Sequence, residues 1–198
     1  MCSSDLAPLV ADPIVRTRGT FVGSVCHADP QGDWAATMIA LDGRIVAQGP
    51  KGRREIAMKD FVLGPFQTAL DYNEIAVEAV IPAPKGKALG GYIKLERRVG
   101  DFATASVAVA LDVVGDKVVR AGIALGGVGS RTIDASEAAA ALVGQPLSEA
   151  TIAKAAELAA AAAEPRSDHR GSADYKRHIV ATFVTRLLKN LNSSKEAA

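Results

Sequence analysis

The chain has 198 residues, of which 48% are hydrophobic, so it is long enough for one large or two small domains with a packed core. Its formal net charge is +1, which indicates neither a nucleic-acid nor a membrane-surface partner. No apolar run is long enough to span a bilayer, and the N-terminus lacks the basic and apolar regions of a signal peptide, so we predict cytoplasmic residence.

In the first half of the chain, from about residue 7 to residue 84, the pattern is mixed. The strands predicted there from β-branched and apolar runs are 14–16, 21–25, 44–48, 53–57 and 74–81. Asp33 is expected to N-cap a short helix that ends at Leu41, because its carboxylate can accept bonds from the first free N–H groups. The Pro- and Gly-containing stretch 82–87 then predicts a domain boundary.

The second half opens with a cleaner strand pattern. The strands predicted there are 89–95, 104–113 and 117–125, and Val114-Gly115-Asp116 is typical of a hairpin turn between the last two. Because these strands precede a block of helices, the pattern favours an α+β fold over a parallel α/β sheet.

Two helices are predicted after these strands. Asp134 is expected to N-cap the first, with Glu137 completing a capping box and Gly144 ending it. Ser148 is expected to cap the second, which runs to Glu164 before Pro165.

A final helix is predicted from about Ser172. Its expected buried stripe recurs every fourth residue and consists of Tyr175, Ile179, Phe183, Leu187 and Leu191. The cationic residues assigned to its other faces are Lys176, Arg177, Arg186 and Lys189.

Cysteine and histidine usage excludes several site types. The two cysteines, Cys2 and Cys26, cannot form a disulfide framework, a four-cysteine metal site or an iron–sulfur cluster held by this chain alone. The histidines, His27, His169 and His178, lack zinc-ligand spacing, and His27 is expected to be a buried, hydrogen-bonded side chain. The sequence also contains no P-loop and no Ser/His/Asp nucleophile motif.

The segment from Arg18 to Asp33 carries the most informative pattern. Glycine permits a close approach of the backbone to a ligand, and the hydroxyls of Thr20 and Ser24 can join backbone N–H groups in cradling a phosphate. This chemistry suits the pyrophosphate of a dinucleotide. The start of an ordinary strand is the alternative, since short glycine motifs are common, and Asp29 is expected to be a turn residue.

Four segments, in order, resemble the FAD-binding medium subunit of the molybdenum hydroxylases, the family of aerobic carbon monoxide dehydrogenase and xanthine dehydrogenase. They are 19–33, 54–61 with 73–82, 92–103, and 167–177. Each motif alone is weakly specific, whereas the four together cover nearly the whole chain after Leu6.

The resemblance implies an α+β architecture. Residues 7–86 would be the C-terminal part of an FAD-binding domain of the vanillyl-alcohol-oxidase (PCMH) type. Residues 87–192 would form a C-terminal domain of antiparallel sheet plus helices, followed by a disordered tail at 193–198.

The resemblance also implies N-terminal truncation, because nothing before Gly19 is similar to the family's other glycine-rich motif. Residues 2–6, Cys-Ser-Ser-Asp-Leu, match the translation of a common sequencing adapter, so we hypothesise that 1–6 is a non-native leader. Re-sequencing the locus tests this hypothesis, and a native stop and start codon at this point would refute it.

Site roles follow from the resemblance. The residues implied to hold the FAD pyrophosphate are Thr20, Phe21, Val22, Gly23 and Ser24. Asp33 is implied to lie near the ribityl chain and Lys94 near the flavin ring, with no catalytic residue and no metal site on this chain. Val22 replaces the first of two adjacent family glycines, which is a departure because valine does not readily adopt positive φ.

The resemblance implies a hetero-oligomer with an iron–sulfur small subunit and a molybdenum-cofactor large subunit. Electrons would pass from the partner's [2Fe-2S] clusters through FAD to an acceptor. Two alternatives stay open: a truncated docking or assembly module that holds no FAD, and a stand-alone protein that binds a different phosphate at the glycine turn.

Overall fold

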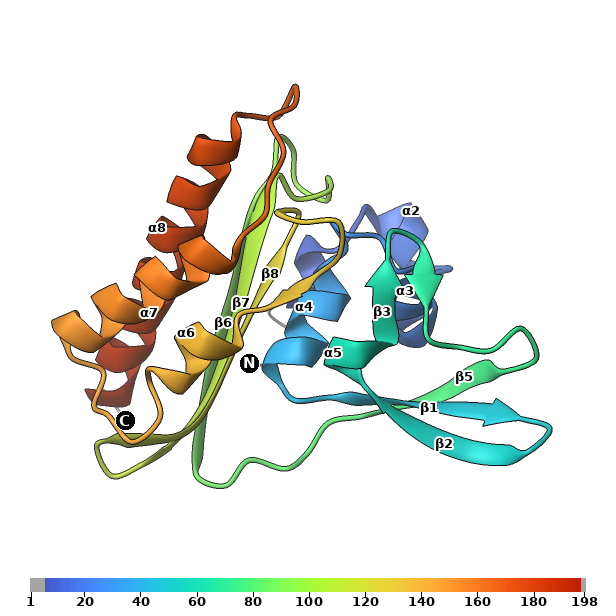
Figure 1. Cartoon of the computed structure of the whole chain (residues 1–198), viewed down its shortest axis with the longest axis horizontal. Coiled ribbons are helices and arrows are strands. Elements are labelled where there is room, and N and C mark those ends of the chain that lie inside the picture. The colour runs from blue at the N-terminus through green and yellow to red at the C-terminus, as the bar shows by residue number, and fades with distance from the viewer. Residues whose placement is uncertain (1–5, 197–198) are drawn as a thin grey trace.

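The structure, a computed structural model, describes residues 6–196 (Figure 1). The expected leader therefore lies outside the described residues except for Leu6, which is buried. The expected tail begins inside the last helix, which extends to Glu196, and residues 197 and 198 lie outside the described range. Within residues 6–196, no helix has the length and apolar character needed to cross a membrane.

The first half opens with consecutive short helices and continues with strands interrupted by one short helix, whereas the second half consists of strands followed by helices. The first half contains η1 (Ala7–Leu9), α2 (Pro13–Arg16), α3 (Phe21–His27), α4 (Asp33–Ala40), β1 (Arg44–Gly49), β2 (Gly52–Ala57), α5 (Met58–Phe61), β3 (Val62–Gly64), β4 (Gln67–Thr68) and β5 (Ile75–Val80). The second contains β6 (Lys87–Leu95), β7 (Ala105–Val114), β8 (Lys117–Gly126), β9 (Ile133–Asp134), α6 (Ser136–Ala140), α7 (Glu149–Ala162) and α8 (Ala173–Glu196).

A four-stranded antiparallel sheet of order β6-β7-β8-β9 lies at the centre of the molecule. Helices α6, α7 and α8 cover one face and α4 covers the other (Figure 1). Successive side chains of a strand point to opposite faces, so Val109 and Leu111 of β7 pack toward α6–α8, whereas Ala108 and Ala110 pack toward α4. The expected α+β fold with an antiparallel sheet followed by helices is confirmed.

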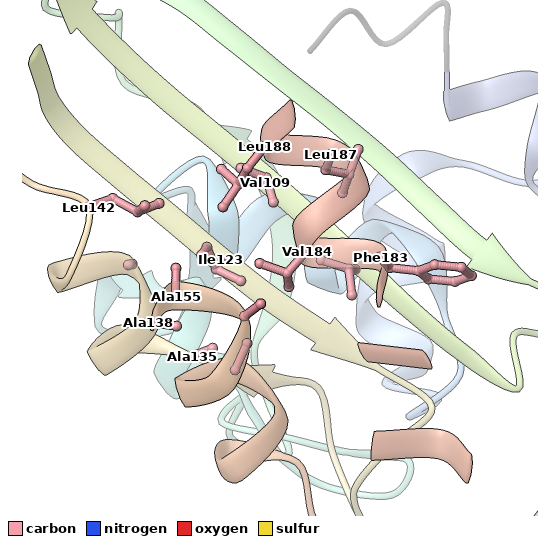
Figure 2. Close-up of a cluster of buried hydrophobic side chains, with 14 of the residues drawn as sticks. Val109, Ile123, Ala135, Ala138, Leu142, Ala155, Phe183, Val184, Leu187 and Leu188 are labelled. Carbon is pink, nitrogen blue, oxygen red and sulfur yellow. The ribbon is translucent and has the colours of Figure 1, made fainter. Parts of the chain in front are cut away.

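The larger core lies between this sheet and α6–α8, as Figure 2 shows for Val109, Ile123, Val184 and Leu188. Leu187 fits against β6 because Gly91 has no side chain: a Cβ there would lie 2.6 Å from the Leu187 Cδ2 atom. Apolar side chains from three helices and from the central sheet thus form one continuous layer, which holds the second half of the chain together.

The predicted stripe of α8 is partly correct. Phe183, Leu187 and Leu191 are buried, whereas the Tyr175 side chain remains 44% exposed. The more deeply buried positions, Val180, Val184 and Leu188, lie one residue further along, because an apolar face of a packed helix is wider than a single i, i+4 row. The assignment of Lys176 to an exposed face is wrong: it is 3% exposed and its ammonium bonds Asp168.

In the first half, a three-stranded antiparallel sheet has the order β2-β1-β5, and β3 and β4 form a short hairpin. The predicted strands at 44–48, 53–57 and 74–81 are confirmed as β1, β2 and β5. Alternating or β-branched apolar residues without a competing cap signal made these three strands predictable.

The strands predicted at 14–16 and 21–25 are wrong, since both segments are helical. Pro13 starts α2, where its fixed φ and missing N–H suit a first helical position. Thr20 N-caps α3 with its hydroxyl. These local start signals outweigh the β propensity of Val15, Val22 and Val25.

The helix caps in the second half follow the predictions in part. Ser148 caps α7 by accepting from the Thr151 N–H at 3.2 Å, as expected. The cap predicted at Asp134 is wrong, because Asp134 pairs in β9 and Ala135 occupies the N-cap of α6 without a side-chain hydrogen bond. The prediction for His27 is also wrong: it is exposed, and its ring contacts Phe66 with centroids 5.1 Å apart.

Candidate cofactor site

The glycine turn forms the start of helix α3. Thr20 is extended, and its Oγ1 accepts the Gly23 N–H at 3.0 Å. A Cβ on Gly23 would lie 2.7 Å from that oxygen, so a larger residue here would require the Thr20 side chain to shift. The N–H groups of Phe21 and Val22 have no preceding helical turn to bond to, and an anion can therefore use them.

Val22 does not strain the backbone, although its replacement of a family glycine led us to expect a restriction on φ. It lies inside α3, and the described non-glycine residues with positive φ are Ala11, Ala28, Asp42 and Phe66. A valine at this position is therefore compatible with the backbone of the turn, because helical φ is available to any L-residue. The hydroxyls of Thr20 and Ser24 belong to exposed residues and add further donors at the same helix start.

The link from α3 to α4 is a tight turn. Ala28 ends α3 in the left-handed conformation with φ 53°, and the Asp29 Oδ1 atom accepts the Gln31 N–H at 2.9 Å. Asp29 is thus a turn residue, as predicted. The Phe21 ring meets the Trp34 ring edge-on with centroids 4.7 Å apart, which connects the glycine turn to the first turn of α4.

Asp33 is the first residue of α4 and is 7% exposed, so the cap predicted there is wrong: Gly32 is the N-cap, without a side-chain hydrogen bond. Two residues of β6 bond its carboxylate: the Tyr92 hydroxyl donates to Oδ1 at 2.5 Å and the Lys94 ammonium donates to Oδ2 at 3.2 Å. The structure thus brings together two predicted site residues, Asp33 and Lys94, that lie 61 positions apart.

Sequence reasoning missed Tyr92. A signal for it exists, since residues i and i+2 of a strand share a face, and Tyr92 therefore lies on the same face as Lys94.

The Lys94 ammonium is enclosed by acceptors. It donates to the Leu9 carbonyl at 2.6 Å and the Asp101 carbonyl at 3.1 Å, and it forms ion pairs with Asp33 and Glu96. Its side chain is only 3% exposed, so these partners replace the water that a lysine normally binds. The Lys94 ammonium therefore contacts three segments of the chain, near residues 9, 33 and 101.

Burial is the main influence on the charges of this cluster. It raises the pKa of Asp33, although the Tyr92 hydrogen bond and the Lys94 charge oppose the change. Burial and the neighbouring Asp33 carboxylate together raise the pKa of Tyr92 well above its ordinary value. Tyr92 is consequently a neutral hydrogen-bond donor to Asp33 throughout the neutral pH range.

A second missed residue, Arg170, holds the loop beside Lys94. Its guanidinium donates to the Phe102 carbonyl at 2.7 Å, and its Nη2 lies 3.9 Å from Asp101 Oδ1. The Phe102 N–H bonds to the Asp101 carboxylate and, with Arg170 and Arg97, lowers the pKa of that group. The segments 92–103 and 167–177 thus meet at this loop.

The donor set fits a dinucleotide with a flavin. Backbone N–H groups and hydroxyls at a helix start suit a pyrophosphate, whereas a buried carboxylate accepts the hydroxyl or N–H groups of a ribityl chain or ring. No three His, Cys, Asp or Glu side chains within the described range are grouped so that they could hold a metal ion.

A cavity of about 310 Å³ lies apart from the predicted site residues, between α4, β8 and α6. Residues lining it include Met58, Arg120, Gly122 and Ala139. None of the seven predicted site residues lines this cavity, so it is not the predicted cofactor site.

Comparison with known families gives two matches along the chain. Residues 2–84 match the family described as the FAD binding domain in molybdopterin dehydrogenase. Residues 91–191 match the CO dehydrogenase flavoprotein C-terminal domain.

Curated relatives are similar over nearly the whole chain. The carbon monoxide dehydrogenase medium chain of Hydrogenophaga pseudoflava is 37% identical over 93% of this chain and 64% of its own length. The nicotine 6-hydroxylase medium subunit of Paenarthrobacter nicotinovorans is 34% identical over 90% of this chain and 62% of its own length. The chain therefore spans less than two thirds of these relatives.

Solved structures agree with this relationship. Carbon monoxide dehydrogenase from H. pseudoflava, in a form that lacks the Mo-pyranopterin moiety, superimposes with a TM-score of 0.91 at 39% identity, covering 95% of this chain and 66% of the other. Quinoline 2-oxidoreductase from Pseudomonas putida 86 gives a TM-score of 0.85 at 34% identity, covering 96% and 66%. The fold, the two family matches and the similar relatives lead to one conclusion: the chain belongs to the FAD-binding medium-subunit family of the molybdenum hydroxylases, a family of oxidoreductase subunits.

Proposed function

We propose that this chain is an FAD-carrying electron-transfer subunit that relays electrons from iron–sulfur clusters on a partner to an acceptor. The observation that carries the proposal is the buried Asp33–Lys94 pair next to the Thr20-capped turn. An acceptor for hydroxyl or N–H groups lies close to an anion-binding helix start, and the family is one that binds FAD.

Each predicted residue has a role in this proposal. The helix start formed by Thr20, Phe21, Val22, Gly23 and Ser24 would hold the pyrophosphate with backbone N–H groups and hydroxyls. Asp33 would accept from the ribityl chain or the ring, and Lys94 would provide a positive charge near the flavin. Bound FAD supplies a centre that takes up and releases electrons, and these residues bind and orient it.

Partners follow from the same proposal. We propose a cytoplasmic hetero-oligomer with an iron–sulfur small subunit and a molybdenum-cofactor large subunit. The relatives are named medium chains or medium subunits, which supports a complex of several chains. The chain has only two cysteines, too few for a four-cysteine iron–sulfur cluster, so the clusters would belong to the partner.

An FAD titration tests the proposal. The visible spectrum and FAD affinity of the 198-residue chain are measured beside those of a chain extended upstream to the full reading frame. Thr20→Val removes the capping oxygen and should weaken FAD binding, whereas the control Thr185→Val removes a hydroxyl that bonds the Ala181 carbonyl within α8. Flavin binding by either form supports the proposal. If neither form binds FAD, the docking-module alternative takes its place.

A further inference from the structure

Tyr92 links Asp33 to the packed interior. Its ring packs against the core cluster beneath α4, and its hydroxyl reaches the Asp33 Oδ1 atom at 2.5 Å. The Lys94 ammonium bonds the other carboxylate oxygen at 3.2 Å. Two donors on the same face of β6 therefore hold the two oxygens separately, which sets the plane of the carboxylate.

We propose that Tyr92 is a positioning residue of the FAD site, which holds the Asp33 carboxylate in the orientation and the ionised form that accept an O–H or N–H group of the cofactor. This inference rests on the proposed function, because it assigns Asp33 to FAD. A carboxylate offers about four lone-pair sites. With one taken by Tyr92 and one by Lys94, the others remain for a ligand.

The surroundings of Asp33 explain why it needs this donor. The charged and titratable groups facing it are Tyr92, Lys94 and Glu96. Burial and the Glu96 charge raise the pKa of Asp33, whereas Tyr92 and Lys94 lower it. Removing the Tyr92 hydroxyl therefore moves protonation of Asp33 to higher pH, and a protonated carboxyl presents a different hydrogen-bonding pattern to a ligand.

The first measurement needs no cofactor. The Asp33 carboxyl is titrated by ¹³C NMR in the FAD-free 198-residue chain, with its signal assigned by its loss in Asp33→Asn. Tyr92→Phe should raise the pKa of Asp33, whereas the control Tyr72→Phe, which changes a fully exposed tyrosine, should not. An unchanged Asp33 titration in folded Tyr92→Phe overturns the inference. Circular dichroism establishes that each variant is folded.

The second measurement uses FAD and whichever chain length binds it. Flavin fluorescence gives the FAD affinity between pH 5 and pH 8. Tyr92→Phe should weaken binding roughly tenfold, the loss expected for one hydrogen bond to a charged group. FAD affinity should fall at low pH as Asp33 becomes protonated. In Tyr92→Phe this fall should occur at higher pH, by the same amount as the Asp33 titration moves. A merely structural role would not produce this coupled shift.

A double-mutant cycle shows whether Tyr92 acts through Asp33. In an Asp33→Asn background, Tyr92→Phe should cause little further loss of FAD affinity. Equal losses in both backgrounds overturn the inference, as does wild-type FAD affinity in Tyr92→Phe. If wild-type chains of both lengths bind no FAD, the proposed function fails first and the cofactor role of Tyr92 fails with it. If wild type binds and the variant matches it, only the inference fails.

Discussion

The backbone carbonyl of Ala40, at the end of α4, occupies the space that a Cβ on Gly122 of β8 would need. Helix and sheet approach this closely because their contact surface consists mainly of small side chains, among them Ala36, Ala108 and Ala124. The contact joins the first half of the chain to the central sheet, and it places Asp33 at the other end of the same helix.

Replacing Gly122 with alanine should destabilise the protein strongly. The new methyl group meets backbone rather than a movable side chain, so the helix must shift away from the sheet. We expect a loss of about 3 kcal/mol in the free energy of unfolding, measured by urea denaturation.

Gly64→Ala is the matched control. A Cβ at Gly64 would contact only the flexible Gln67 side chain, at 3.4 Å. Its unfolding free energy should stay within about 1 kcal/mol of wild type. Equal losses in the two variants would contradict the proposed close approach at Gly122.

The buried Asp112–Arg120 pair should make stability sensitive to acid. Asp112 is fully buried and accepts from Arg120 Nε at 3.0 Å and from the Lys85 N–H at 2.9 Å. Burial alone would raise its pKa, yet the bonds from Arg120 and Lys85 outweigh burial and lower it. Because the folded-state pKa lies below the unfolded one, the pair stabilises above about pH 4, and that contribution is lost as pH falls through the folded pKa.

Asp112→Asn should therefore lower the unfolding free energy by about 2 kcal/mol at pH 7 and should flatten its dependence on pH below about 4. Thermal unfolding between pH 3 and pH 7 measures both effects. Glu157→Gln, in an exposed pair with Lys154, should change stability by less than about 0.5 kcal/mol. If Asp112→Asn still loses stability steeply below about pH 4, Asp112 is not the source of the acid sensitivity.

Lys176 should contribute to stability, although the other lysines and arginines of α8 named above were assigned, like it, to faces outside the buried stripe. Its ammonium bonds Asp168 at 2.6 Å and the Arg166 carbonyl at 3.0 Å, which ties the preceding segment to the helix. Lys176→Met keeps the buried chain but removes these bonds, so we expect a loss of about 2 kcal/mol in urea denaturation.

Lys189→Met is the comparison for this prediction. The Lys189 side chain is 56% exposed and lies 3.8 Å from Glu149, so its loss should be close to neutral. If both methionine variants unfold at the same urea concentration, the Lys176 contacts do not stabilise the fold.

Ser148 should contribute through its cap on α7. Ser148→Ala should cost about 1 kcal/mol of unfolding free energy, whereas Ser148→Asp should retain most of the stability, since aspartate also caps well. Ser136→Ala tests the specificity of the effect, because Ser136 follows the N-cap of α6, which lacks a side-chain bond. A similar loss for Ser136→Ala would remove capping as the explanation.

How much of this fold could be predicted depended on which signal dominated locally. Strands such as β1 and β7 follow apolar patterns without competition, and their positions were predictable. In α3 the signals conflict: Phe21 and Val22 favour a strand, but Thr20 provides an N-cap that favours a helix. Hydrophobic periodicity does not show where a side-chain hydrogen bond will favour the start of a helix.

The site shows the same division. Asp33 and Lys94 were predicted through resemblance, whereas Tyr92 and Arg170 were not, since their importance arises from contacts across 59 and 68 positions. Lys176 was misplaced because its partner, Asp168, lies on a different segment that no helical pattern includes. Long-range polar partners depend on the tertiary fold, and residue patterns within one element do not contain that information.

The enclosure of Lys94 has a consequence for the order of events in the cell. Its surroundings are contributed by Leu9, by Asp33 and by a loop that Arg170 holds in place. During synthesis, residues 9 and 33 leave the ribosome long before residue 170, so the loop beside Lys94 gains its contact with Arg170 only when nearly all of this chain has emerged. On the proposed function, FAD would therefore meet a site with its supporting loop in place only after nearly all of this chain has been made.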